Sequence, residues 1–483
     1  FLRFAYRGRS RSHDPGAKRG CTAALVDEHC RHDFSVPLLR RGGQAAVREL
    51  LDRVAGVLGG TLLALTTLTV LAAPLVAGLF APGFLDQPAK FALTADLIRV
   101  TFPYLLLISL TGLCGAVLNS YGRFAVPAVT PVFLNLSLIA AATVAAPWFE
   151  EPAFALAWGV FTAGVVQLLF QLPFLRRLEL VPRPRWDTAH PGVRQILKLM
   201  VPALFGVSVS QVNLLLDTVL ASFLPTGSVS WLYYSDRLAE LPLGVFGIAI
   251  ATVILPSLSA DRAAAREERF TPTLDWAVRT VLLVAVPATA ALLVLAEPIL
   301  ITLFQYGELS PRDVAMAGYS LRAYALGICA FMLIKVLAPG FYARQDMVTP
   351  VRIGIRAMVA NMVLNIAFVV PLMVYLDLGH VGLALATSVA AYLNAGLLWR
   401  GLRREGIYRF DPAWRVFLPR LLAATAVMVG LVLWLSPGAQ AWLAWGWQRR
   451  ALELAQLVTV GGGAYVAILA AAGVRLRDLR SPP

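Results

Sequence analysis

The sequence predicts an all-α membrane protein with about twelve transmembrane helices. Only 14% of its 483 residues are charged, whereas a soluble domain has about 25%. Apolar runs of about 20 residues or more, the length that crosses a bilayer, recur along the chain. The net charge of +14 would suggest nucleic acid for a soluble chain. Here the arginines lie mostly between the apolar runs, which indicates a topology signal, so we expect no nucleic-acid partner.

The apolar runs begin at about Val54, and the residues before them do not resemble the rest. Residues 1–50 are rich in arginine and histidine and contain no run long enough to span, which is typical of a solvated or disordered arm. The expected spans are residues 54–80, 93–120, 126–149, 153–175, 197–224, 229–258, 274–305, 314–341, 350–377, 380–400, 415–436 and 451–474.

Arginines concentrate in alternate loops, and this bias predicts the orientation of the chain. Cytoplasmic loops carry an excess of Lys and Arg, so the arginine-rich loops and the C-terminus should be cytoplasmic. Arg449 and Arg450, before the last span, lie on the opposite side and are the exception. The basic loops contain Arg123, Arg176, Arg177, Arg183, Arg185, Arg194, Arg262, Arg266, Arg269, Arg344, Arg403, Arg404 and Arg409, and the tail contains Arg475, Arg477 and Arg480.

The stretch from Pro202 to Leu258 reads as two apolar helices that carry polar stripes, joined by the turn Pro225–Ser228. Residues three or four apart lie on one face of a helix. An ionised side chain facing lipid costs at least a few kcal/mol. The stripes should therefore face each other, other helices or a wet cavity. The first stripe is Gly206, Ser210, Asn213 and Asp217, and the second is Ser230, Tyr233, Arg237, Glu240 and Gly244, with Asp236 beside it.

Arg237 lies about two turns inside the second helix, near 10 Å from its start at 1.5 Å per residue. One interpretation is a locally neutralised Arg–Glu pair with Glu240 that holds two helices together. The other is a cation lining a cavity and gripping a phosphate, since guanidinium pairs with phosphate oxygens through two hydrogen bonds. Pro242 and Gly244 just after it could bend the helix.

Two further charges within spans have open interpretations. Asp217 could be the partner of Arg237, a snorkelling carboxylate near the outer end, or, with Asn213, a site for a coupling cation or proton. Lys335 could snorkel to the interface or line the same cavity as Arg237. Arg352 and Arg356 form a basic helix face that suits anionic head groups, but the positive-inside bias explains that face equally well.

No catalytic or metal-ligand motif is present in a believable context, so we expect no catalytic residue, no metal site and no cofactor. Coupling to the membrane potential or to a monovalent cation stays open. A membrane-embedded glycosyltransferase or ligase would need a large outer loop with paired carboxylates. The outer loops here are short and carry only stray acids such as Glu150 and Glu151. A transporter is therefore favoured over an enzyme.

Several long runs of the sequence resemble the lipid II flippase family (MurJ/MviN) of the multidrug/oligosaccharidyl-lipid/polysaccharide exporter superfamily. The resemblance extends from about Gly42 to the C-terminus. Its main run is VSVSQVNLLLDTVLASFLPTGSVSWLYYSDRLAELPLGVFGIAIATVILPSLS (Val207–Ser259). The others are FPYLLLISL (Phe102–Leu110), LNSYGRFAVPA (Leu118–Ala128), FQYGELS (Phe304–Ser310) and KVLAPGFYARQDMVTPV (Lys335–Val351).

The resemblance implies a transporter of the bacterial inner membrane that moves lipid II, the undecaprenyl-pyrophosphate-linked peptidoglycan precursor, by alternating access for cell-wall biogenesis. Its partners would be lipid II, membrane lipids and, as candidates, cell-wall synthesis proteins. The family's functionally important Arg of the YYxDR motif matches Arg237, and Ser230, Asp236 and Glu240 match the same segment. Some members carry a sodium site, whose first acid Asp217 could match. Another lipid-linked oligosaccharide flippase, or a drug/cation antiporter of the superfamily, is the alternative.

The resemblance also implies the domain organisation: fourteen helices in two six-helix lobes around a central cationic cavity, plus a C-terminal pair. Residues 51–178 would form a four-helix remnant of the N-lobe, residues 194–405 the six-helix C-lobe, and residues 413–475 the pair. The family's first two helices should lie where residues 1–40 are, and nothing there resembles them. A truncated or out-of-frame N-terminus, or a divergent paralogue, would explain this. We therefore expect the chain as given not to flip substrate.

Overall fold

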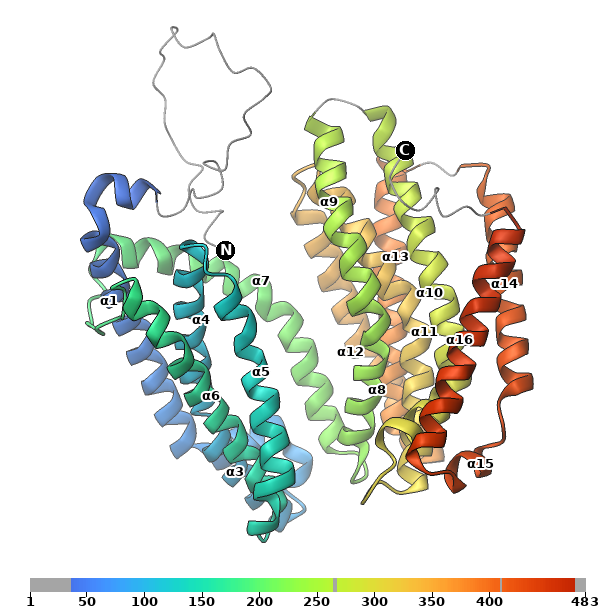
Figure 1. The fold of residues 1–483 in the computed structure, drawn as a ribbon, viewed down its shortest axis with the longest axis horizontal. Helices are drawn as coiled ribbons and strands as arrows, with labels where there is room; N and C mark the ends of the chain where they lie inside the picture. Colours follow the sequence, from blue (N-terminus) through green and yellow to red (C-terminus); the bar gives the residue numbers. More distant parts are fainter. Residues whose placement is uncertain (1–35, 264–266, 409–410, 474–483) are drawn as a thin grey trace, which may run out of the picture. The chain divides into compact units, whose positions relative to one another are not determined.

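The computed structural model describes residues 36–263, 267–408 and 411–473, and the regular structure of these residues is helical throughout (Figure 1). The chain forms two compact units, Phe1–Ser208 and Val209–Pro483, whose boundary falls within helix α7 (Pro191–Ser222). The predicted all-α class is confirmed.

Unit 1 contains six helices before α7, and prolines set several of their ends. They are α1 (Val36–Leu71), α2 (Ala73–Phe80), α3 (Pro88–Thr101), α4 (Tyr104–Ser120), α5 (Ala125–Ala140) and α6 (Pro152–Arg177). The expected span 54–80 is divided, because Pro74 opens α2 directly after α1 ends. The expected span 93–120 is likewise interrupted at Pro103, between α3 and α4. Proline lacks the N–H that would continue a helix.

Helix α1 begins at Val36, so it extends into the range that composition assigned to the N-terminal arm. Residues 1–35 lie outside the described part of the chain. Short π and 3₁₀ segments, Ala141–Ala145 and Ala146–Trp148, follow α5.

A buried polar network joins α5 and α6 in unit 1. Pro131 in α5 cannot donate to the carbonyl of Pro127. The hydroxyl of Thr130 donates to that carbonyl instead, at 2.5 Å. From α6, Gln167 then donates to the carbonyl of Thr130 at 3.0 Å. A proline that breaks the helical ladder is thus accommodated by side chains, as buried backbone groups require.

Unit 2 contains the remaining helices. They are α8 (Ser228–Pro242), the π segment Leu243–Gly247, α9 (Ile248–Ala263), α10 (Glu267–Phe304), α11 (Pro311–Tyr342), α12 (Val348–Leu376), α13 (Gly379–Arg404), α14 (Trp414–Leu435), the short α15 (Ala439–Ala444) and α16 (Trp447–Ala471). The first of them is continuous from α8 through the π segment into α9.

Ten helices of the described chain are long and apolar enough to cross a membrane, against about twelve expected. The protein is therefore a multi-pass membrane protein. The expected spans 197–224 and 229–258 fall on α7 and on α8–α9, which are not among the ten. Side chains in both α7 and α9 lie outside the described part of the chain, so these two expected spans stay predictions.

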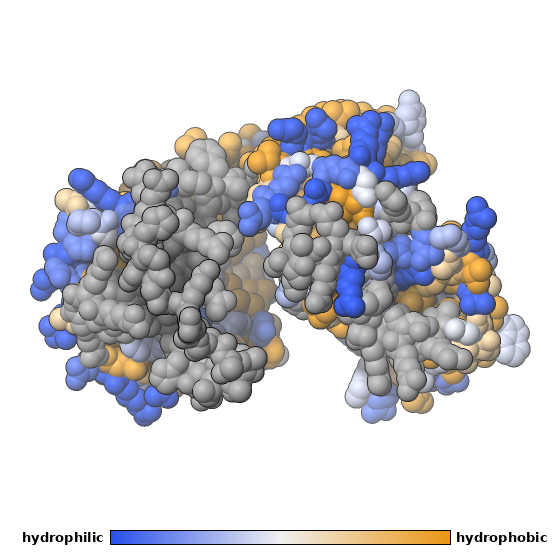
Figure 2. Space-filling view, turned by 90° about the horizontal axis from the view of Figure 1, so that it is seen from above, coloured by the Kyte–Doolittle hydropathy of each residue, from blue (hydrophilic) through white to orange (hydrophobic). Residues whose placement is uncertain are grey.

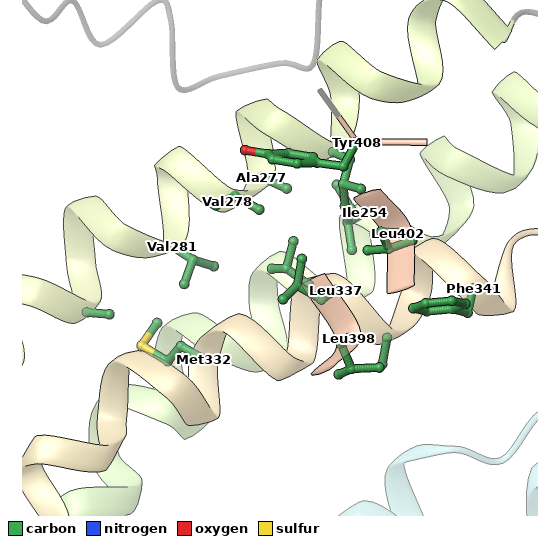
Figure 3. Packing of buried hydrophobic residues seen from close by; sticks show 14 of the residues in the cluster. Ile254, Ala277, Val278, Val281, Met332, Leu337, Phe341, Leu398, Leu402 and Tyr408 are labelled. Carbon is green, nitrogen blue, oxygen red and sulfur yellow. The ribbon is translucent and has the colours of Figure 1, made fainter. Parts of the chain in front are cut away.

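Helix α11 is the centre of unit 2, with 56% of its most apolar stretch buried. It packs against α8, α9, α10 and α13. Its C-terminal half contributes Met332, Leu337 and Phe341 to a buried hydrophobic cluster, to which neighbouring segments add Ile254 and Tyr408 (Figure 3). Lipid is as apolar as these side chains, so close packing rather than exclusion from water must hold the cluster together.

The contact between α12 and α13 depends on a glycine, and a substitution there should be costly. A Cβ on Gly382 would lie 2.8 Å from the backbone nitrogen of Val369, an atom that cannot rotate away. We expect Gly382→Ala to lower the free energy of unfolding by about 1–3 kcal/mol through overpacking. Gly396→Ala, on the same helix, would meet nothing within 4 Å, and should instead stabilise by about 0.5–1 kcal/mol. Denaturant unfolding in detergent measures both, and equal stabilities of the two variants would contradict this packing.

Candidate functional site

Helix α8 presents a polar stripe on one side and is buried on the other. The side chains of Tyr233, Arg237 and Glu240 are 58%, 55% and 51% exposed, and Ser230 is exposed in the first turn. Trp231, Ser235, Leu238 and Ala239 of the opposite face are buried. The spacing of three and four residues thus places the predicted residues on one exposed face.

Contacts with α10 and α11 fix the rotation of α8. The indole Nε1 of Trp231 donates to Asp313 Oδ1 at 2.8 Å. The hydroxyl of Ser235, which is fully buried, donates to the carbonyl of Ala317 at 2.7 Å. The ring of Tyr234 packs on Phe304, with centroids 4.7 Å apart. Because these contacts lie on the buried side, the face with Arg237 must point outward.

Arg237 is held by residues of its own helix. Its Nη1 donates to Glu240 Oε2 at 2.8 Å, and its Nη2 lies 3.8 Å from Asp236 Oδ2. The guanidinium also lies over the ring of Tyr233, 5.3 Å from the centroid. The ion pair with Glu240 is intrahelical and exposed, so it does not hold two helices together. A guanidinium has five N–H donors, and one hydrogen bond leaves most of them available for an anion.

The helix is irregular directly after this stripe, as Pro242 and Gly244 predicted. Helix α8 ends at Pro242, and the π segment Leu243–Gly247 separates it from α9. Proline removes a backbone donor, and π segments frequently mark functional sites. The irregularity lies one turn from Glu240, at a place where α8 could reorient relative to α9.

Asp217 lies in a second polar cluster, formed by α7, α12 and α13. Asn365 Nδ2 donates to Asp217 Oδ1 at 2.7 Å and lies 3.1 Å from Asn361 Oδ1. Asn361 Nδ2 in turn donates to the hydroxyl of Thr387 at 3.4 Å. Asn361 and Asn365 are 3% and 0% exposed. Asn365 Oδ1 is buried and has no hydrogen-bond partner in the described part of the chain.

The predicted site residues therefore separate into two groups. Arg237 pairs with Glu240, and Asp217 pairs with Asn365, so the two charges do not neutralise each other. Lys335 is exposed on α11, and both of its interpretations stay open. The side chain of Asn213 lies outside the described residues, although its backbone belongs to α7.

Sequence reasoning overlooked Asn361, Asn365 and Thr387. A usable signal existed, because two asparagines four apart in an apolar run lie on one face and are expensive in lipid. It also overlooked the ion pair between Arg322 of α11 and Glu297 of α10, 2.9 Å apart.

Arg450, one of the two arginines that broke the loop-charge pattern, is 7% exposed and bound within unit 2. Its guanidinium donates to four carbonyl oxygens at 3.0–3.3 Å, those of Trp442 and Leu443 near the end of α15, and those of Ile301 and Gln305 at the end of α10. Carbonyls at a helix C-terminus carry partial negative charge. Arg450 therefore joins the start of α16 to α15 and to the end of α10.

The sequence model described as lipid II flippase MurJ matches residues 34–447. This chain belongs to the MurJ family. The probable lipid II flippase MurJ of Vibrio cholerae is 51% identical over 441 residues, which cover 90% of this chain and 83% of that protein. The lipid II flippase MurJ of Burkholderia cenocepacia is 41% identical over 407 residues, 83% of this chain and 78% of that protein.

Solved structures confirm the fold of the MurJ family for this chain. A lipid II flippase MurJ in an inward closed conformation matches with a TM-score of 0.73 at 22% identity, covering 92% of this chain and 87% of that one. A multidrug resistance MATE family transporter matches with a TM-score of 0.62 at 17% identity, covering 77% and 85%. The resemblance found in the sequence and the assignment to a transporter family rather than to an enzyme are thus confirmed.

Proposed function

We propose that this protein is a lipid II flippase of the bacterial inner membrane that works by alternating access and serves cell-wall biogenesis. The identity of 51% to a probable lipid II flippase, extending over most of both chains, is the observation that carries the proposal. The exposed Arg237 of α8 also supports it. A charged side chain within a membrane is energetically expensive, so its presence there indicates a function. The antiporter alternative is supported only by fold similarity, at 17% identity.

In this proposal Arg237 holds the pyrophosphate of lipid II. A phosphate oxygen would replace Glu240 as the partner of Nη1 and would use the remaining donors, because charge-assisted pairs of Arg and phosphate accept two hydrogen bonds at once. Ser230 and Asp236, on and beside the same stripe, would contact the polar head group. When the substrate leaves, the ion pair between Glu240 and Arg237 would form again, so the guanidinium would always have an anionic partner. Lys335 lies 18 residues beyond Ala317, the contact of Ser235, which is about 27 Å along α11, so it is proposed to line the cavity away from the pyrophosphate.

The cluster around Asp217 is proposed to hold a monovalent coupling cation. One carboxylate, the amide oxygens of Asn361 and Asn365, and the hydroxyl of Thr387 are oxygen ligands of the kind that hard cations prefer. A single carboxylate balances one positive charge. Because α7, α12 and α13 all contribute, a bound cation would tighten the contact between these helices. Asn213, one turn before Asp217, is proposed as a further ligand.

We expect sodium to stabilise the protein against unfolding, and Asp217→Asn to abolish the effect. A ligand at one hundred times its Kd stabilises the folded state by about 2.7 kcal/mol. The measurement is thermal unfolding in sodium chloride against choline chloride at equal ionic strength. Asp377→Asn is the matched control, since Asp377 is an exposed residue at the end of α12 in a left-handed conformation that asparagine tolerates. An unchanged sodium response in Asp217→Asn would remove the cation site from the proposal.

The arginine-rich ends of the helices are proposed to be cytoplasmic, together with the C-terminus. Cell-wall synthesis proteins are proposed partners that would act on lipid II before or after its transfer.

The proposed function is tested in a bacterial strain whose own lipid II flippase can be depleted. On this proposal, and against the expectation drawn from residues 1–40, expression of this chain should restore growth and should make lipid II accessible to a reagent on the outer side of the membrane. Lipid II that stays protected on the inner side, in cells that contain the protein in the membrane, would contradict the proposal for this chain. Comparison with the Vibrio cholerae relative in the same strain controls for the assay.

A further inference from the structure

Two arginines near the start of α12 have no partner among the residues that the structure describes. Arg352 and Arg356 are exposed, and no ion pair, hydrogen bond or ring contact to either exists within the described residues. Some other arginines at this end of unit 2 have carboxylate partners within the described residues. Arg344 lies 2.7 Å from Glu405, and Arg279 lies 3.1 Å from Asp411. Here carboxylates neutralise some arginines and leave this pair unneutralised.

The two arginines continue an apolar face of the same helix. Being four apart, they lie on one face, about 6 Å apart along the axis. The residues seven further on, Val359 and Val363, are 51% and 62% exposed, and Ile366 extends the same face at 63%. From Val359 to Val370 the exposed residues of α12 are all apolar. Arg352 and Arg356 thus lie at the end of an exposed apolar face of α12 that is suited to contact lipid chains.

Seen from above, this end of unit 2 carries many hydrophilic residues beside hydrophobic ones (Figure 2). The combination matches one kind of molecule, which has an anionic head and an apolar tail. Guanidinium groups bind phosphate oxygens with two parallel hydrogen bonds, and basic residues at a membrane surface attract anionic lipids. The face offers no exposed polar side chain along its apolar part that would recognise a sugar. A simple phospholipid fits it better than a glycolipid does.

We propose that this face of α12 binds an anionic glycerophospholipid, with the phosphate between Arg352 and Arg356 and an acyl chain along Val359, Val363 and Ile366. A positive-inside signal alone requires only charge near the membrane. It does not require two arginines in register with an exposed apolar stripe and without carboxylate partners. The phosphate of the bound lipid neutralises Arg352 and Arg356 in place of a carboxylate of the protein. The inference does not depend on the proposed transport activity.

The test compares lipid binding to purified full chains by native mass spectrometry. The probes are dioleoyl phosphatidylglycerol and dioleoyl phosphatidylcholine. The variant is Arg352→Gln with Arg356→Gln. The matched control is Arg176→Gln with Arg177→Gln, which removes the same charge from two exposed residues in the last turn of α6. Each basic residue at a membrane surface contributes about 1 kcal/mol, and about 1.4 kcal/mol is tenfold. The preference for phosphatidylglycerol should therefore fall about 30-fold in the variant and stay unchanged in the control.

A lysine variant and a competing head group provide two further tests of the same site. The pair Arg352→Lys and Arg356→Lys keeps the charge but loses the two-bond geometry, so it should retain only part of the preference. Glycerol phosphate, the head group without tails, should not displace the lipid, since the apolar face contributes to binding. An equal loss in the α6 control would show general surface charge and overturn the site. Unchanged binding in the glutamine variant would overturn it too. Displacement by undecaprenyl pyrophosphate would assign the face to substrate instead, and would also overturn it.

Discussion

Replacement of Arg237 by alanine is expected to cause a severe loss of lipid II translocation while leaving the protein folded in the membrane. The side chain is 55% exposed and, among the described residues, bonded only within its own helix, so its removal should create no cavity and break no described contact between helices. A hydrogen bond to a charged group contributes about 1.5–3 kcal/mol, which corresponds to a loss of about 10- to 150-fold in rate if the bond forms during transfer. The measurement is the outer accessibility of lipid II in cells that have no other flippase.

Arg237→Lys should rescue this loss only in part, because an ammonium offers a point charge and not a planar pair of donors. Arg312→Ala is the matched control, since Arg312 is an exposed arginine in the first turn of α11 of the same unit. It should transfer lipid II normally. Normal transfer by Arg237→Ala would refute the proposed grip on phosphate. Equal loss in both variants would attribute the effect to total charge and not to Arg237.

Replacement of Arg450 by alanine is expected to give the largest loss of stability among the substitutions considered. Its guanidinium satisfies carbonyl oxygens of α10 and of the α15 segment, and it is 7% exposed. Each buried acceptor left unsatisfied costs about 1–3 kcal/mol, so the whole change should cost about 3 kcal/mol or more. Denaturant unfolding in detergent measures the total. Hydrogen exchange should show faster opening of residues 439–450 than of the rest of unit 2.

The adjacent arginine provides the control for this prediction. Arg449 is 62% exposed, stacks on Trp445 at 4.4 Å, and lies 3.9 Å from Glu453. Exposed contacts of this kind contribute about 0–1 kcal/mol, so Arg449→Ala should hardly change stability. If the two alanine variants unfold alike, the carbonyl cage around Arg450 does not hold the C-terminal helices to α10.

The amino-acid pattern was sufficient for the helices and for the polar face of α8. A chain in hydrocarbon must satisfy every backbone polar group internally, which only helices and closed barrels do. Continuous apolar runs of about 20 residues fit helices, because barrel strands are short and alternate apolar with polar residues. Charges inside such runs are expensive and therefore stand out. Spacing along the sequence then placed Ser230, Tyr233, Arg237 and Glu240 on one face, as the structure has them. Resemblance of long ordered runs was enough for the family.

The tertiary structure alone decided which groups meet. Asp217 finds Asn365, 148 positions away, and Arg450 finds Ile301, 149 positions away. Spacing along the chain specifies a helix face, but contacts across helices depend on the rotation and depth of each helix, and close packing sets these. The same limit explains why the sequence could single out Arg450 but not the carbonyl oxygens that it binds. The free-energy cost of a charge in lipid depends on the residue type and can be read from the sequence. The groups that offset this cost lie on other helices, so only the tertiary structure identifies them.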